Sequence, residues 1–216
     1  DAKPLERLTA LVVQPGRPPR VVSPFLEKEA ALASPIGDLG FDVVTWNETE
    51  DPFHLMASLT GPVDQVAAAG RLWVYKLLRL QSALPSVNFV SANAAIANLR
   101  MAKTEAEIES LRKAGAAIDW VHQQVAGLLK VGRTEAEVGR DIADLIIKSG
   151  HISADFVIVG SGPNSASPHH EVSDRTIQQG DAVVVDIGGT MPDGYCSDST
   201  RTYHMGTPTD EYVSRY

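Results

Sequence analysis

Two aspartates, Asp186 and Asp198, carry the clearest chemical signal in this sequence. Asp186 lies inside the apolar run at residues 183–187, which is typical of a strand buried on both faces. A carboxylate that loses its water there costs several kcal/mol, unless a charged partner or a metal ion compensates it. The residues alone also allow a second interpretation, in which Asp186 ends the strand and caps a turn at Gly188 and Gly189.

Asp198 follows twelve residues later, beyond a turn rich in glycine at residues 188–194. If the chain folds back there as an antiparallel hairpin, the two carboxylates come to lie side by side. Like charges at that spacing repel, so the pair requires a cation such as Mn²⁺ or Mg²⁺. Thr200 and Arg201 are then expected to orient the carboxylates. The alternative, a solvated Asp198 paired with Arg201, is disfavoured because residues i and i+3 of a strand point to opposite faces.

The segment that must position these aspartates begins with two helices. Thr104 and Glu107 stand at capping-box spacing, and the apolar residues after them keep a helical period to residue 129. Thr134 and Glu137 repeat the capping box at the start of a second helix, which ends near residue 149. After residue 150 the sequence predicts strands at residues 156–159, 182–187 and 195–205.

The first hundred residues show a different pattern, in which short strands and short helices alternate. Such alternation is typical of an α/β domain. Strands at residues 8–13 and 20–23 are expected to pair as a hairpin across a turn rich in proline. Further strands are predicted at residues 41–46, 71–75 and 87–90, and helices at residues 25–33, 51–58 and 94–99.

Residues 184–189 and 194–202 together resemble the signature of the pita-bread metallopeptidases, the family of methionine aminopeptidase, aminopeptidase P and prolidase. In that family, two aspartates at these positions help to bind a pair of divalent ions, usually Mn, Co or Zn. The resemblance implies that Asp186 and Asp198 are metal ligands for two divalent metal ions, with manganese expected first. Their spacing is one residue longer than in many members, and the extra residue falls in the turn at residues 191–193, where an insertion is tolerated.

Residues 164–175 are similar to the segment that precedes the first aspartate in prolidase-like members of the family. The substrate-site histidine of those members is not a metal ligand; it matches His169, which is therefore expected to be catalytic. A neutral imidazole there could hydrogen-bond the substrate or its developing charge. His170 is the rival candidate, and both could instead be ordinary histidines of an exposed loop. Of the other histidines, His54, His122 and His151 lie far from the motif along the chain, and His204 matches no ligand position of the family and is expected to be structural.

The resemblance extends over most of the chain and implies two domains. Residues 1–100 are similar to the creatinase/prolidase N-terminal domain, a small α/β domain, with its start missing. Residues 101–216 are similar to the first half of the α+β pita-bread catalytic domain, with the C-terminal half missing. In the family the N-terminal domain narrows the active-site entrance and aids dimerisation, so a homodimer is expected. The other three metal ligands of the family, a histidine and two glutamates, would lie beyond residue 216, so the fragment alone is expected to be inactive.

The function implied by the resemblance is metal-dependent hydrolysis of peptide bonds that precede proline, as in Xaa-Pro dipeptidase or aminopeptidase P. One alternative is creatinase-like hydrolysis without metal on the same fold, in which a histidine matching His169 moves the proton. Retention of both Asp186 and Asp198 argues against it, because that chemistry needs no paired carboxylates. The other alternative is a pita-bread module that binds peptides without catalysis.

The composition argues against other classes of function. The formal net charge is −8, and Lys and Arg form no cluster, which disfavours nucleic acid as a partner. No apolar run reaches the roughly 20 residues that span a bilayer, so no membrane partner is expected. Cys196 is the one cysteine, so no internal disulfide can form, and a reducing compartment, the cytoplasm, is expected.

Overall fold

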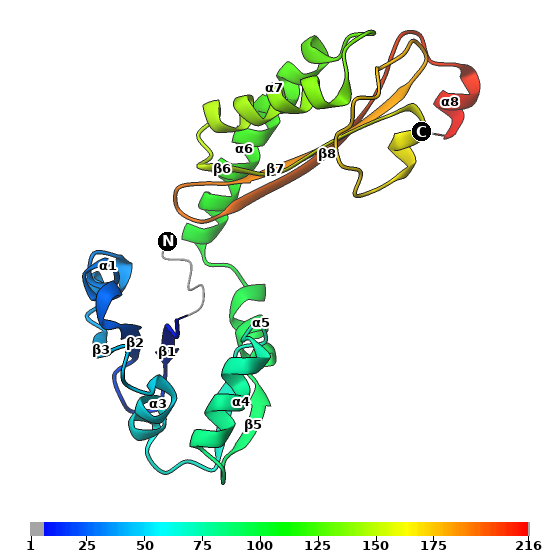
Figure 1. Ribbon diagram of the computed structural model, residues 1–216. Coiled ribbons are helices and arrows are strands. Elements are labelled where there is room, and N and C mark those ends of the chain that lie inside the picture. The colour runs from blue at the N-terminus through cyan, green and yellow to red at the C-terminus, as the bar shows by residue number, and fades with distance from the viewer. Residues whose placement is uncertain (1–6, 216) are drawn as a thin grey trace. The chain divides into compact units, whose positions relative to one another are not determined.

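The computed structural model describes residues 7–215 and divides into two compact units, with the boundary after Ala102 (Figure 1). Each unit combines helices and strands around a hydrophobic core of its own. Within residues 7–215, no helix is both long enough and apolar enough to cross a membrane.

The N-terminal unit contains two small sheets. β1 (Ala10–Val12) and β2 (Arg20–Pro24) pair antiparallel, which confirms the predicted hairpin, and β3 (Asp42–Trp46) pairs parallel with β2. β4 (Gln65–Ala68) and β5 (Asn88–Ser91) form a separate parallel pair. The helical elements of this unit are η1 (Phe25–Glu27), α1 (Lys28–Leu32), α2 (Pro35–Asp38), α3 (Pro52–Thr60), α4 (Val74–Ala83) and α5 (Asn93–Met101).

A cluster of large apolar side chains holds the N-terminal unit together. Trp46 at the end of β3, Phe53 in α3 and Leu80 in α4 are buried in this cluster. The indole Nε1 of Trp46 donates a hydrogen bond to the backbone oxygen of Leu8 at 3.0 Å. Asp51 caps α3 by accepting a hydrogen bond from the backbone N–H of Phe53 at 2.9 Å, which confirms the helix start predicted there.

The strand predicted at residues 71–75 is wrong. Trp73 and Val74 are exposed at 55% and 70%, and α4 begins at Val74. The strand of this region is β4, which lies earlier in the chain. α4 instead buries Lys76 and Leu80, which are four residues apart and so share one helix face. A short apolar run fits a strand or a half-buried helix equally well. Here the segment from Val74 on forms a helix.

The two helices of the C-terminal unit are α6 (Glu105–Leu128) and α7 (Glu135–Lys148), and both confirm the prediction. Each begins at a capping box, in which a threonine hydroxyl accepts from the N–H of a glutamate three residues on. The carboxylate of that glutamate accepts from the N–H of the threonine in return. The two pairs are Thr104 with Glu107 and Thr134 with Glu137.

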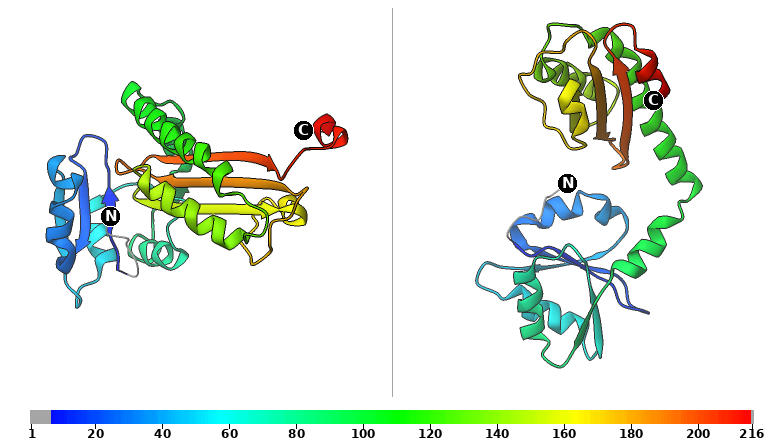
Figure 2. Two further views of the ribbon diagram at one scale, coloured as in Figure 1. Left: turned by 90° about the horizontal axis from the view of Figure 1, so that it is seen from above. Right: turned by 90° about the vertical axis from the view of Figure 1, so that its right-hand side faces the viewer.

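Three antiparallel strands form the sheet of the C-terminal unit: β6 (Ser153–Ser161), β7 (Ala182–Thr190) and β8 (Cys196–His204). α7 packs against β6 and α6 against β8, and both helices bury their apolar residues against β7 (Figure 1, Figure 2). The short elements η2 (Gly162–Ala166) and α8 (Asp210–Arg215) complete this unit. The fully buried core residues include Val121 and Val125 of α6, Val138, Ile142 and Ile146 of α7, and Val183, Val185 and Ile187 of β7.

The two faces of this sheet differ in what they carry. Val183, Val185 and Ile187 point toward α6 and α7 and are completely buried; we call this side the helix-covered face. Val184 and Asp186 alternate with them and point to the opposite side, where both are half-buried; we call it the open face. The open face is the surface on which Asp186 and Asp198 lie.

The glycine-rich turn between β7 and β8 is shorter than predicted. Gly188 and Gly189 lie inside β7, and the chain turns only after Thr190, with Gly194 at a φ of +84°. A Cβ added at Gly188 would come within 2.4 Å of the Phe156 ring. Glycine at this position therefore allows the ring of Phe156 to lie close to β7, and it does not mark the end of the strand.

Candidate active site

The open face brings Asp186 and Asp198 together. In the antiparallel register of β7 and β8, Asp186 is paired with Thr200, and Asp198 is paired with Gly188. Residues two apart on a strand share a face, so Asp198 lies diagonally across from Asp186 on the same face. The alternative in which Asp186 caps a turn is excluded, because β7 continues past it to Thr190.

Thr200 and Arg201 take different positions around this pair. The hydroxyl of Thr200 donates a hydrogen bond to Oδ1 of Asp186 at 2.5 Å, which agrees with the predicted orienting contact. Arg201 points to the helix-covered face and makes an ion pair with Asp119 of α6 at 3.3 Å. The orienting role predicted for Arg201 is therefore wrong, and so is the alternative pairing of Asp198 with Arg201.

The surroundings of Asp186 are less apolar than the sequence predicts. The run at residues 183–187 is buried on the helix-covered face, but Asp186 is half-buried and Asp198 is exposed. Predicting burial on both faces was wrong, because strand alternation places the fully buried valines and Asp186 on opposite sides. Ile158 of β6 is the neighbour of Asp186 on the other edge. The carboxylate therefore lies between an aliphatic side chain and a hydroxyl.

The donor chemistry of this pair fits a hard divalent cation. Within residues 7–215, the Thr200 hydroxyl is the one hydrogen-bond donor that reaches the Asp186 carboxylate, and none reaches the side chain of Asp198. Carboxylate oxygens on one face that lack donors suit ions such as Mn²⁺. Among the described residues, no three His, Cys, Asp or Glu side chains gather as a metal site. Asp186 and Asp198 alone are therefore fewer side chains than a complete metal coordination shell needs.

Two buried histidines hold β8 from the helix-covered face. Nε2 of His151 lies 2.8 Å from Oγ of Ser197, and Nε2 of His122 lies 3.0 Å from the backbone oxygen of Ser199. Ser197 and Ser199 are the chain neighbours of Asp198, so both contacts fix the strand beside it. Burial lowers the pKa of both imidazoles, which favours their neutral form. The sequence did not reveal these contacts, because His122 in α6 and His151 before β6 are far from Ser197 and Ser199 along the chain.

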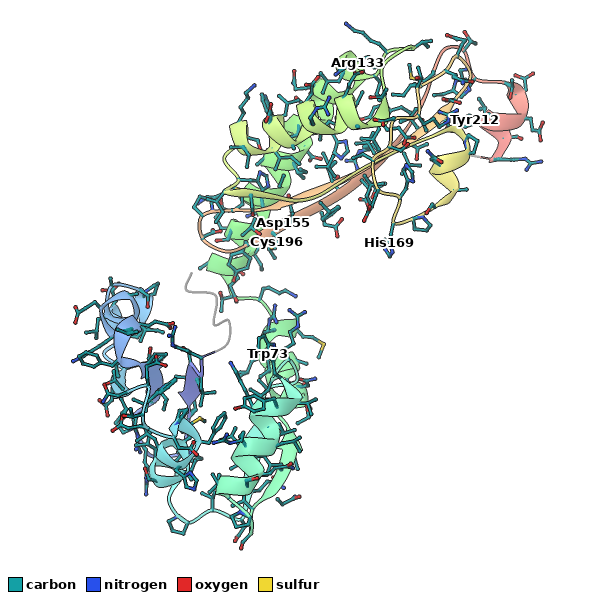
Figure 3. The ribbon with its side chains drawn as sticks, viewed as in Figure 1. Trp73, Arg133, Asp155, His169, Cys196 and Tyr212 are labelled. Atoms are coloured by element: carbon teal, nitrogen blue, oxygen red, sulfur yellow. The ribbon has the colours of Figure 1, made fainter. Side chains whose placement is uncertain are left out.

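The two candidate histidines lie in the long connection between β6 and β7 but differ in their surroundings. His169 is exposed, and Figure 3 shows its side chain projecting outward from the loop. His170 is half-buried, and its Nε2 lies 2.8 Å from Oε2 of Glu135. The imidazole of His169 is therefore exposed to solvent, whereas that of His170 is held by Glu135. The catalytic role of His169 stays a prediction.

Glu135 is the residue that sequence reasoning missed. Its side chain is completely buried at the start of α7, where it accepts hydrogen bonds from the connection between β6 and β7. Burial alone would raise its pKa, but these hydrogen bonds outweigh burial and hold the pKa at about 2. In the sequence Glu135 looks like an ordinary acidic residue of a first helical turn, so no local signal reveals its burial. The donors are the N–H and Oγ of Ser161, Nδ2 of Asn164, Nε2 of His170 and Oγ of Ser173.

Relatives with similar sequences share both parts of the chain. Residues 109–216 match the model of metallopeptidase family M24, and residues 4–102 match the creatinase/prolidase N-terminal domain. The probable dipeptidase PepE of Mycobacterium tuberculosis is 48% identical over 217 residues, and the Xaa-Pro dipeptidase of Lactobacillus helveticus is 33% identical over 226 residues. These alignments cover 100% and 99% of this chain, but only 57% and 59% of the relatives. The chain therefore spans less than two thirds of their length.

Solved structures show the same fold. Dipeptidase PepE from Mycobacterium ulcerans is 47% identical with a TM-score of 0.91, over 98% of this chain and 57% of that one. A prolidase from Thermococcus sibiricus is 27% identical with a TM-score of 0.86, over 99% of this chain and 58% of that one. The predicted fold class is confirmed: a creatinase/prolidase N-terminal domain followed by part of a pita-bread domain. The chain belongs to metallopeptidase family M24.

Proposed function

We propose that the full-length protein is a metal-dependent Xaa-Pro dipeptidase, which hydrolyses the peptide bond that precedes proline. The observation that carries this proposal is the placement of Asp186 and Asp198 on one open face, with most of their oxygens free of donors. The names of two relatives support it, since one is a probable dipeptidase and the other an Xaa-Pro dipeptidase. They also favour dipeptides over the longer substrates of an aminopeptidase.

In this proposal Asp186 and Asp198 are ligands of two divalent metal ions, and manganese is the first choice because hard ions prefer carboxylate oxygens. Such ions, when bound, activate water and polarise the scissile carbonyl. Thr200 holds one oxygen of Asp186 and so limits the rotation of its carboxylate. The histidines beneath β8 keep the backbone of Asp198 in place.

We assign substrate contact to His169. It is exposed, so its imidazole is free to meet a peptide, whereas the ring of His170 is engaged by Glu135. A neutral histidine can donate a hydrogen bond to a substrate carbonyl on which charge develops. His169 is therefore the proposed catalytic residue of this chain, and His170 is not.

The proposal also covers the substrate, the assembly and the location of the enzyme. A proline-containing peptide is the proposed partner, and a homodimer is the proposed assembly, in keeping with the matched N-terminal domain. The net charge of −8 speaks against nucleic acid as a ligand. A single cysteine suits the reducing cytoplasm, which is the proposed location.

A full-length variant that lacks both aspartates tests the proposal. Wild-type protein with Mn²⁺ should hydrolyse an Xaa-Pro dipeptide and lose that activity on chelation. Replacing both Asp186 and Asp198 by asparagine should abolish it. The matched control is Asp119→Asn, which removes one exposed carboxylate of α6 that pairs with Arg201 and should leave hydrolysis within a few-fold of wild type.

Two results would contradict the proposal. Hydrolysis that survives both chelation and the double substitution would favour creatinase-like chemistry without metal. Peptide binding without turnover by metal-loaded wild-type protein would favour a non-catalytic module.

A further inference from the structure

The carboxylate of Glu135 joins the last residue of β6 to three points of the long connection that follows it. Its side chain is completely buried and lies at the first residue of α7. Oε1 accepts from the N–H and the hydroxyl of Ser161 at 2.8 and 2.7 Å, and Oε2 accepts from the hydroxyl of Ser173 at 2.6 Å. Nδ2 of Asn164 lies 3.1 and 3.2 Å from the two oxygens, and Nε2 of His170 lies 2.8 Å from Oε2. One carboxylate thus holds the chain at four points between residues 161 and 173.

The backbone of α7 reinforces the same attachment. The N–H groups of the first helical residues have no partner within a helix. Here the N–H of Glu135 donates to the oxygen of Arg175 at 3.1 Å, and the N–H of Ala136 donates to the oxygen of Ser173 at 2.9 Å. Residues 173–175 of the connection are therefore bound to the helix by backbone and side chain together.

An ion pair closes the base of the connection. Arg175 forms two hydrogen bonds with the carboxylate of Asp181, at 2.7 and 3.0 Å, and its Nη1 also lies 2.5 Å from Oγ of Ser161. That hydroxyl in turn donates to Glu135. The last residue of β6 and residues 175 and 181 of the connection thus meet in one continuous set of hydrogen bonds.

His169 lies between the attached points. Asn164 precedes it and His170 follows it directly, and both contact Glu135, whereas His169 itself is exposed (Figure 3). A carboxylate can only accept hydrogen bonds, so Nε2 of His170 must carry the proton in this contact. The contact therefore fixes both the ring orientation of His170 and the backbone from which His169 projects.

We propose that Glu135 and His170 are positioning residues, which hold the connection between β6 and β7 so that His169 meets the substrate. The inference rests on the proposed function, because it takes His169 as the residue that touches the peptide. The inference adds Glu135 and His170 as residues that act through His169. Glutamine cannot replace Glu135, since its amide group would point a donor at the donors that surround it.

The first test compares Glu135→Gln with Glu137→Gln in the full-length protein. Both substitutions remove one negative charge from the first turn of α7, but Glu137 is exposed and caps Thr134, and within residues 7–215 no hydrogen bond joins it to the connection. Glu135→Gln should lower kcat by roughly 100-fold with little change in KM, since misplacing a reacting group by about 1 Å costs that much. Glu137→Gln should stay within a few-fold of wild type.

A second readout does not depend on catalysis. Limited proteolysis of the same proteins should cut residues 162–175 at least about tenfold faster in Glu135→Gln than in Glu137→Gln, because opening of a segment controls its cleavage. Equal cleavage rates in the two variants would overturn the attachment itself. If wild-type protein lacks Xaa-Pro hydrolysis, the proposed function fails, but this readout still decides whether Glu135 holds the connection.

Variants of His170 show whether this residue positions the connection or takes part in proton transfer. They also provide a test if Glu135→Gln does not fold. His170→Gln keeps an N–H donor for Glu135, so it should retain most of the wild-type kcat, whereas His170→Ala should lose roughly as much as Glu135→Gln. If His170→Gln is as inactive as His170→Ala, His170 takes part in the chemistry and the positioning role is wrong. If His169→Ala retains full activity while Glu135→Gln does not, Glu135 does not act through His169, and the proposal is equally wrong.

Discussion

Two groups of carboxylates in the C-terminal unit differ in how their oxygens are satisfied. Glu135 is completely buried, and side chains and backbone of four other residues donate to it. Asp186 and Asp198 share the open face, where one hydroxyl donates to Asp186 and none of the described donors reaches the side chain of Asp198. A carboxylate that the fold itself satisfies stabilises structure, whereas a pair left unsatisfied is available to a cation.

The lowered pKa of Glu135 shows how strongly its hydrogen bonds stabilise the charged carboxylate. Burial acts to raise this pKa, but the hydrogen bonds from Ser161, Ser173 and His170 hold it at about 2. The buried charge therefore needs no metal ion, even though a histidine lies beside it. At Asp186 the Thr200 hydroxyl is the one donor among the described residues, so this carboxylate receives far less compensation from the fold than Glu135 does.

The largest expected effect comes from the aspartates. Asp186→Asn or Asp198→Asn alone should lower kcat/KM by at least ~1000-fold, because losing a ligand exceeds the 10- to 100-fold effect of losing a group behind one. The thermal stability of the metal-free protein should stay equal or rise, since each change relieves repulsion between like charges. Steady-state kinetics and thermal unfolding measure the two effects. A large loss of metal-free stability would show that the aspartates, like Glu135, support the fold.

Glu135→Ala, in contrast to the aspartate variants, should lower the stability of the metal-free protein. The substitution leaves several buried donors without an acceptor, and it should lower the free energy of unfolding by about 3 kcal/mol or more. Urea unfolding of the metal-free full-length protein measures this loss. Glu137→Ala is the control and should cost no more than about 1 kcal/mol, because Glu137 is solvent-accessible and serves only the capping box. Equal losses for the two variants would contradict the buried role of Glu135.

Acid should remove the contribution of Glu135 selectively. Its folded pKa of about 2 lies below the ordinary 4.5, so its stabilisation is complete above pH 4.5 and is lost as the pH falls toward 2. The difference of about 2.5 units corresponds to about 3 kcal/mol. The unfolding free energy of wild type minus that of Glu135→Gln should shrink over this range. A difference that stays constant from pH 7 to pH 2.5 would contradict the lowered pKa.

Thr200→Val should have the smallest effect of the four. Valine keeps the shape and removes the hydroxyl that donates to Asp186, which should weaken metal binding by about 10- to 100-fold, as losses of such supporting contacts usually do. Thr202→Val is the matched control on the same strand and face, because it faces Val184 instead of a carboxylate. Metal titrations of both variants measure the effect, and equal affinities would show that Thr200 does not orient Asp186.

The strongest local signals in the sequence predicted the structure well. The capping boxes at Thr104 and Thr134 give both helix starts, because a cap depends on residues only three apart. The placement of Asp186 and Asp198 on one face follows from a hairpin register that the spacing of the motif implies. These features depend on contacts between residues that are close in sequence.

Features that depend on packing were not predictable in the same way. Residues 71–75 carry an apolar run that fits two kinds of element, and only the core shows which one forms. Glu135 and His170 are 35 residues apart, and His122 and Ser199 are 77 apart. No local pattern encodes such contacts, so the buried carboxylate and the histidines beneath β8 emerge only from the folded chain.

The most direct measurement is a Mn²⁺ titration of the full-length protein, followed by calorimetry or by the paramagnetic signal of free Mn²⁺. The proposed site predicts two bound ions per chain in the wild type and in Asp119→Asn. It predicts that replacing both Asp186 and Asp198 by asparagine weakens binding at least about 100-fold. Unchanged stoichiometry and affinity in that double variant would contradict the metal site.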